Sequence, residues 1–181
     1  MSNDKALPTR LLEKLKAHFI YRREATAGQT GATADELKRK ALTRMERGGL
    51  PGITAATLRG DLKPTPSYCA AMDYWRDLTF GDGSKRFLLL LGAVGVGKTV
   101  AAAHACRLIL SGLLADQASG RSELFCYIHA TTFGRLSAYD KNDTEWFETL
   151  KRTRVLMLDD LGTESLNDQG KQMFNELFEA R

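Results

Sequence analysis

The stretch "GAVGVGKT", residues 92–99, decides the fold. It fits the pattern G-x-x-x-x-G-K-[ST] at every fixed position, and it stands between an apolar run at 86–92 and an apolar helical stretch at 98–115. Glycines let such a loop turn so that its backbone N–H groups converge on phosphate oxygens, and the following helix adds partial positive charge at its N-terminus. The pattern predicts a phosphate-binding loop between a strand and a helix, in preference to a glycine-rich turn with a chance lysine.

This loop supplies the candidate nucleotide-binding residues, which are Gly92, Gly95, Val96, Gly97, Lys98 and Thr99. A lysine in the position of Lys98 reaches the β- and γ-phosphates of a nucleotide, and the hydroxyl of Thr99 is placed to ligate Mg²⁺. The ligands predicted for this loop are therefore the phosphates of a nucleotide and Mg²⁺.

A second stretch, "VLMLDDLG" at 155–162, places two aspartates at the end of an apolar run. Burying an ionised carboxylate without a partner is costly, and two adjacent carboxylates repel unless one holds a cation or a proton. A phosphate-binding loop needs an acidic group on a neighbouring strand to hold Mg²⁺. We therefore predict that Asp159 binds Mg²⁺ together with Thr99, and that Asp160 is the catalytic residue that orients or deprotonates an attacking water. The alternative is that the pair only caps the following turn.

Continuous apolar runs alternate with helical patterns over the second half of the chain. The expected strands are 86–92, 124–130 and 154–159, and the expected helices are 68–78, 98–115, 132–139, 143–152 and a last one through Met173 and Phe178. Apolar strands separated by helices indicate a parallel sheet covered on both faces. The fold class predicted is α/β, a P-loop parallel sheet sandwiched by helices.

The N-terminal part is predicted to be helical. Residues 8–23 have amphipathic spacing, and Thr33 with Glu36 forms a capping box ahead of a second apolar stripe. That stripe contains Leu37, Ala41, Leu42 and Met45, and glycines 48 and 49 end it. Residues 50–66 look like a loop. We expect a helical partner-binding module at 1–48 and a P-loop domain at 49–181; the alternative is that the helices pack on the rest of the chain.

Composition indicates in which compartment the protein works and which kinds of partner suit it. The chain has 181 residues, three scattered cysteines and no secretory signal, which favours a reduced, cytoplasmic protein. Its longest apolar run, 87–91, is too short to span a bilayer, so we expect no membrane association. Residues 1–60 hold twelve basic and six acidic residues, a net +6 within an overall charge of +4. This basic part suits nucleic acid, an acidic protein surface, or simply a solvated helical face.

The motifs together resemble a known group. "LDDLGTE" at 158–164, "FNELFEAR" at 174–181 and "GLPGITAATLRGDL" at 49–62, joined to the phosphate-binding loop, are similar to the DnaC-like and IstB-like AAA+ ATPases. The resemblance covers 49–181. It implies an AAA+ type of P-loop fold, ATP binding by the loop, and roles in Mg²⁺ binding and hydrolysis for the acidic pair. Glu164 also matches, without an assigned role. The resemblance further implies a polar switch residue, for which His129, Thr131 and Thr132 are the candidates.

The resemblance implies a function as well. DnaC-like proteins load replicative helicases, and IstB-like proteins are ATP-dependent partners of transposases. We expect an ATP-hydrolysing helicase loader in DNA replication that contacts the helicase through residues 1–48, with DNA, in single-stranded form, as a secondary contact. Three alternatives stay open: an ATPase partner of a transposase, a P-loop small-molecule kinase, and a nucleotide-binding remnant without turnover.

The resemblance also implies parts that 49–181 does not contain. In the family, the core continues with a strand bearing a sensor residue, an arginine finger and a helical lid. We therefore expect a chain truncated within the AAA+ core, with a gap in the sheet between the 86–92 strand and the Asp159 strand. We also expect weak turnover from the chain alone, and self-association only in a longer one.

Overall fold

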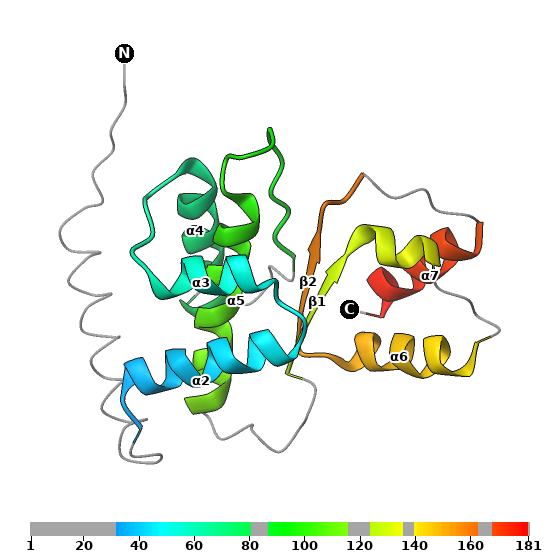
Figure 1. Ribbon diagram of the computed structural model, residues 1–181, viewed down its shortest axis with the longest axis horizontal. Helices are drawn as coiled ribbons and strands as arrows, with labels where there is room; N and C mark the ends of the chain where they lie inside the picture. Colours follow the sequence, from blue (N-terminus) through cyan, green and yellow to red (C-terminus); the bar gives the residue numbers. More distant parts are fainter. Residues whose placement is uncertain (1–31, 81–86, 116–123, 136–139, 163–167, 181) are drawn as a thin grey trace.

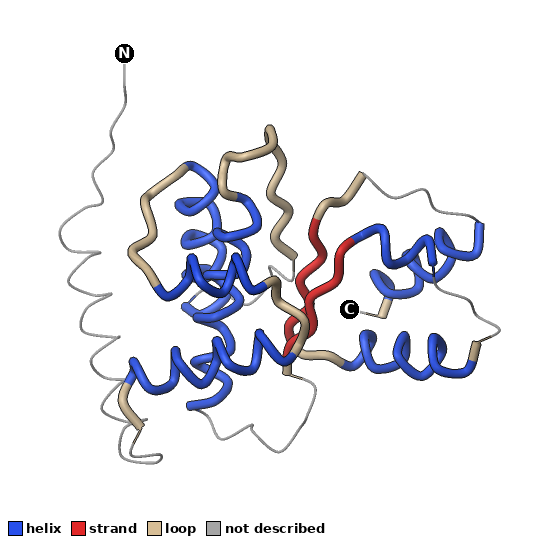
Figure 2. The backbone as a smooth tube through the Cα atoms, viewed as in Figure 1, coloured by secondary structure: helices blue, strands red, loops and turns tan. Residues whose placement is uncertain are grey.

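The computed structural model describes residues 32–80, 87–115, 124–135, 140–162 and 168–180 (Figure 1). The helix expected at 8–23 lies outside these residues. The described elements are α2 (Ala34–Arg47), α3 (Gly52–Arg59), α4 (Pro66–Phe80), α5 (Lys98–Ala115), β1 (Phe125–His129), the 3₁₀ helix η1 (Ala130–Arg135), α6 (Lys141–Arg152), β2 (Val155–Asp159) and α7 (Asp168–Glu179). Figure 2 shows the two strands side by side between two groups of helices.

The sheet of the described residues consists of β1 and β2, which pair in parallel with Phe125 opposite Val155 and His129 opposite Asp159. The chain between them passes through η1 and α6. Successive side chains of a strand point to opposite faces, so each strand contributes to two cores. The predicted strands at 124–130 and 154–159 are confirmed.

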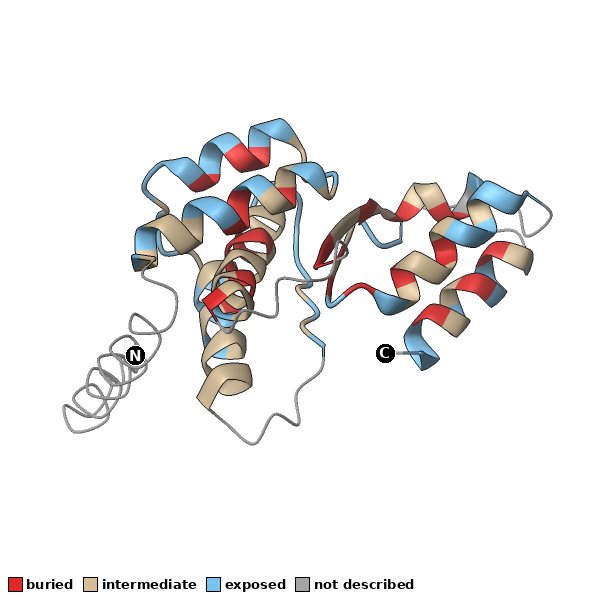
Figure 3. Cartoon of the chain, turned by 90° about the horizontal axis from the view of Figure 1, so that it is seen from below, coloured by how far each residue is buried: buried red, intermediate tan, exposed pale blue. Residues whose placement is uncertain are grey.

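Helices cover both faces of this sheet. Phe125, Val155 and Met157 lie in one apolar cluster with buried residues of α2, α3 and α5. Ile128 lies in a second cluster on the other face, with buried residues of η1, α6 and α7. Figure 3 shows buried positions along α5 and on the strands, with exposed positions on the outer helical faces. The protein is therefore of mixed α/β class, with a parallel strand pair between helical layers.

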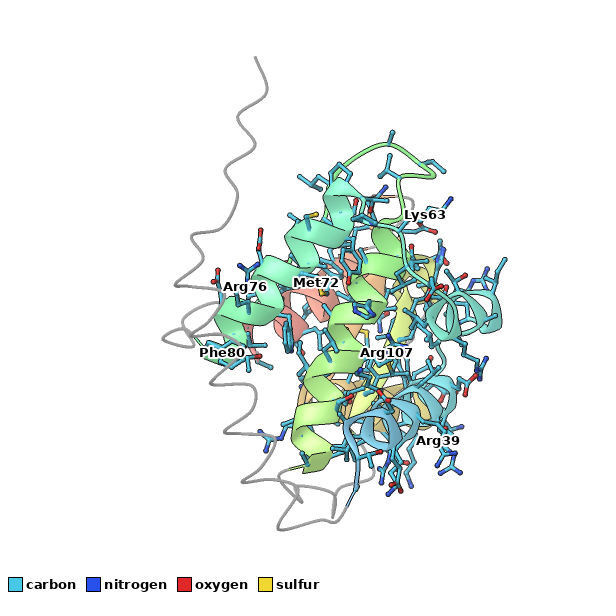
Figure 4. All side chains as sticks on the ribbon, turned by 90° about the vertical axis from the view of Figure 1, so that its left-hand side faces the viewer. Arg39, Lys63, Met72, Arg76, Phe80 and Arg107 are labelled. Atoms are coloured by element: carbon cyan, nitrogen blue, oxygen red, sulfur yellow. The ribbon has the colours of Figure 1, made fainter. Side chains whose placement is uncertain are left out.

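Helix α5 is the centre of the first helical group. It contacts α2, α3, α4 and β2, and Figure 4 shows α4 running beside it. Its bounds agree with the predicted 98–115. Among the described helices it alone has the length and apolar composition of a membrane span. Its buried face, which includes Ala103 and Leu110, packs in the protein's own core.

Helix α2 belongs to this same core. The hydroxyl oxygen of Thr33 accepts a hydrogen bond from the Glu36 N–H at 3.2 Å, as the capping box predicts. Leu42 and Met45 are buried against the α5 cluster, so these two side chains are not available to a partner helix. The arrangement is the second one the sequence allowed, in which the helix packs on the rest of the chain. The domain boundary at 48/49 stays a prediction.

Residues 50–66 are not simply a loop, because α3 forms within them. The helix begins after Pro51, whose φ of −56° suits a helix start. It offers no side-chain cap, and its stability comes from burying Thr54, Ala55 and Leu58 in the core. A helix of eight residues is marginal alone, so tertiary packing decides this segment.

The strand predicted at 86–92 is not observed. Residues 87–91 pair with no strand among the described residues. Leu88 and Leu90 pack against buried alanines of α4 and α5. Phe87, Leu89 and Leu91 alternate with them and are 53%, 64% and 82% exposed. The burial of this run has the two-residue period of a strand, but no described segment shares backbone hydrogen bonds with it, and without such a neighbour a sheet does not form.

Candidate functional site

The loop between 87–91 and α5 is built on glycine geometry. The φ angles of Gly92, Gly95 and Gly97 are +148°, +83° and +82°, in the region that residues with a Cβ atom rarely adopt. At Gly95 a Cβ atom would meet nothing within 4 Å, so backbone conformation and not space requires glycine there. Helix α5 starts at once, with the Ala101 N–H donating to the Gly97 carbonyl at 2.9 Å. The first N–H groups of the helix therefore face the loop, as an anion site needs.

Lys98 folds back over this loop. Its ammonium donates to the Gly92 carbonyl at 2.8 Å and to the Ala93 carbonyl at 2.7 Å. A phosphate group in the loop would offer the ammonium a charged acceptor in place of two neutral ones. Val96 has no donor in its side chain, so a phosphate contact from this residue would come from its backbone N–H.

Thr99 and Asp159, which are 60 positions apart, meet at the base of the loop. The Thr99 hydroxyl lies 3.0 Å from both carboxylate oxygens of Asp159. Helix α5 supplies the first residue in its opening turn, and β2 supplies the second at its carboxyl end. The structure thus brings together the two residues predicted to bind Mg²⁺.

These two residues fit a magnesium ion chemically. Mg²⁺ prefers oxygen ligands and is usually held by one or two protein groups, with phosphate oxygens and waters completing the shell. A hydroxyl and a carboxylate beside a phosphate-binding loop supply that set. The described residues contain no cluster of three or more His, Cys, Asp or Glu side chains, which is the arrangement an all-protein metal cage would need.

Tyr127 is a member of the site that sequence reasoning missed. Its phenol donates to Oδ2 of Asp159 at 3.0 Å. Burial raises the pKa of Tyr127 well above its ordinary value, and the charge of Asp159 adds to the effect. The phenol therefore remains a donor at neutral pH. Nothing in the local sequence marks Tyr127; only the pairing of β1 with β2 shows that it faces Asp159.

Asp160 turns away from Asp159 and meets the end of β1. Its φ is +55°, and Nε2 of His129 lies 2.9 Å from its Oδ2. The other ring nitrogen of His129, Nδ1, is 2.8 Å from the hydroxyl of Thr131. Of the three switch candidates, His129 contacts Asp160, and Thr131 contacts the other side of the His129 ring. The two aspartates therefore have separate environments, as the predicted division of roles requires.

The other histidine in this half of the chain is structural. His104 lies buried in α5, packs beside Tyr68 with the rings tilted by 31° and their centroids 5.4 Å apart, and contacts Arg107 through Nδ1. Burial lowers the pKa of His104 to about 4, and the charge of Arg107 contributes. Arg107 in turn donates to the Leu58 carbonyl, which ties α5 to the end of α3. Glu164 lies outside the described residues.

Comparison with known proteins finds no match to a family model, to a curated protein or to a solved structure. The functional interpretation therefore rests on the sequence motifs and on the geometry of the site.

Proposed function

We propose that this chain is an ATP-binding and ATP-hydrolysing protein of the AAA+ type, which acts in DNA replication as a helicase loader. The observation that carries the nucleotide site is the 3.0 Å contact between Thr99 and Asp159. A glycine-rich turn without a ligand has no need of a threonine placed against a carboxylate 60 residues away. Beside a triphosphate, the same pair is a magnesium site.

Hydrolysis is assigned to Asp160. It stands one residue beyond the magnesium-binding Asp159, but its carboxylate is directed to His129 and not to Thr99. A carboxylate next to the γ-phosphate and outside the metal shell is suited to orient a water for attack. In the observed arrangement His129 holds this carboxylate, so the proposed reaction requires Asp160 to exchange the imidazole for the water or to act while bound to both.

The replication partner is inferred from the motifs at 49–62 and 158–164. Because Leu42 and Met45 are buried, any partner contact through α2 would use its outer surface. Arg39 and Arg47 are exposed there, and basic side chains suit an acidic protein surface or the DNA backbone. A transposase partner would use the same nucleotide site, so a pull-down with purified helicase and with purified transposase separates these two functions.

The first experiment measures equilibrium binding of a fluorescent ATP analogue with Mg²⁺. Lys98→Ala should abolish binding, because it removes the charge beside the β- and γ-phosphates. Lys141→Ala is the matched control: it removes the same charge from the first turn of α6, where the side chain is exposed and pairs only loosely with Glu145, N to O 3.6 Å. Equal affinity in wild type and Lys98→Ala would refute the nucleotide site.

The second experiment measures single-turnover hydrolysis of bound ATP in a form of the protein that hydrolyses ATP measurably. Asp160→Asn should bind ATP within about twofold of wild type and hydrolyse it on the order of 10² times more slowly or worse, as loss of a general base predicts. Unchanged hydrolysis in Asp160→Asn would show that this residue only shapes the turn after β2.

A further inference from the structure

We propose that Tyr127 is a positioning residue, which fixes the Asp159 carboxylate in the orientation that leaves the Thr99 oxygen open for Mg²⁺. This inference rests on the proposed function. It starts from the fact that Asp159 is held by two hydroxyl groups from different elements, Thr99 of α5 and Tyr127 of β1.

The two hydroxyl groups contact the Asp159 carboxylate in different ways. Each hydroxyl has one proton to donate, and Thr99 lies equally close to both oxygens of Asp159. Tyr127 contacts only Oδ2. The phenol selects one carboxylate oxygen, which the Thr99 hydroxyl does not do, and so Tyr127 sets the rotation of the Asp159 carboxylate. The Thr99 hydroxyl donates its proton to this carboxylate, and the lone pairs of its oxygen remain available to a cation.

Tyr127 is itself held firmly enough for this role. Its backbone N–H donates to the Gly48 carbonyl at 2.8 Å, at the end of α2, and in the sheet it stands opposite Met157. Its ring packs against the apolar cluster that contains Met157. Backbone and ring are therefore anchored by groups outside the nucleotide site, and the hydroxyl alone reaches into it. A phenylalanine would keep the packing and lose only the hydrogen bond to Asp159.

The test compares Tyr127→Phe with wild type by titrating Mg²⁺ into protein with fluorescent ADP, and by measuring ADP affinity in EDTA. Removing a group that orients a metal ligand typically weakens metal affinity 10- to 100-fold. Tyr127→Phe should therefore raise the Mg²⁺ concentration for half-maximal binding by about that factor and leave the metal-free affinity for ADP unchanged. Tyr68→Phe is the matched control, because it removes a phenol hydroxyl from α4, where the Tyr68 ring lies beside His104 of α5. This variant should change neither the Mg²⁺ dependence nor the metal-free affinity for ADP.

The outcomes separate this inference from the proposed function. If wild type binds no nucleotide, with or without Mg²⁺, the proposed function fails. If wild type shows Mg²⁺-dependent binding and Tyr127→Phe shows the same dependence, only the role of Tyr127 fails. A variant that loses metal-free affinity and unfolding midpoint together, with an unchanged response to Mg²⁺, would show that Tyr127 is merely structural and would also overturn the inference.

Discussion

The run at 87–91 leaves Phe87, Leu89 and Leu91 exposed, whereas the run at 155–159 buries Val155 and Met157 between helical layers. Both runs are apolar, and both lead into a turn that carries site residues. The second run pairs with β1 along its whole length, and the first pairs with no described strand. The difference teaches that an apolar run becomes a buried strand only where a neighbour satisfies its backbone and helices cover both of its faces.

The largest expected effect is on the free energy of unfolding, which should respond very differently to substitutions in the two runs. Met157→Ala should lower the free energy of unfolding by about 2–5 kcal/mol, because it opens a cavity in the cluster shared with α5. Leu89→Ala should change it by about 0.5 kcal/mol or less, because the side chain is 64% exposed. Chemical denaturation of both variants checks this. A loss at Leu89 as large as that at Met157 would mean that another surface covers the first run in solution.

The next effect is a pH dependence of folding stability. It arises in α5, one of the two helices against which the first run packs. His104 has a folded-state pKa of about 4, below its ordinary 6.5, so the unfolded chain binds more protons between these values. Stability from this residue is present above pH 6.5 and is lost as pH falls toward 4, by up to about 2 kcal/mol at pH 5. Denaturation at pH 7 and pH 5 should show a smaller difference for His104→Gln than for wild type. Equal differences would place the pH dependence elsewhere.

A smaller effect tests the turn that follows the first run. Gly95→Ala should cost about 1–2 kcal/mol, since alanine must adopt a φ of +83° there. Gly112→Ala, in the last turn of α5 and with open space around it, should stabilise the protein by about 0.5–1 kcal/mol. The two substitutions add the same methyl group, so opposite signs in urea denaturation identify backbone strain as the cause. Two changes of the same sign would contradict this explanation.

Much of the second half of the chain was predictable from periodicity and motif. The helix at 98–115 and the strands ending at His129 and Asp159 follow from apolar patterns bounded by turn residues. The meeting of Thr99 with Asp159 follows from the spacing of a phosphate-binding loop and an acidic strand end.

The remaining features depend on contacts that local sequence does not encode. Helix α3 is short and uncapped, and it is stabilised by burying Leu58 in the core. The contacts of Tyr127 with Asp159 and of His129 with Asp160 require the parallel register of β1 and β2. The continuous apolar run at 87–91 predicts a strand covered on both faces, but the sequence does not say whether a neighbouring strand is present, and the observed burial alternates instead.

In the proposed function, the turns after the two runs form one magnesium–nucleotide site. A double-mutant cycle on Mg²⁺-dependent ATP affinity, with Thr99→Val, Asp159→Asn and the double variant, tests it most directly. If both residues hold the same ion, the double variant should lose little more affinity than the weaker-binding single variant, and all four proteins should bind ATP about equally in EDTA. Losses of the two single variants that add up in the double variant would contradict a shared site.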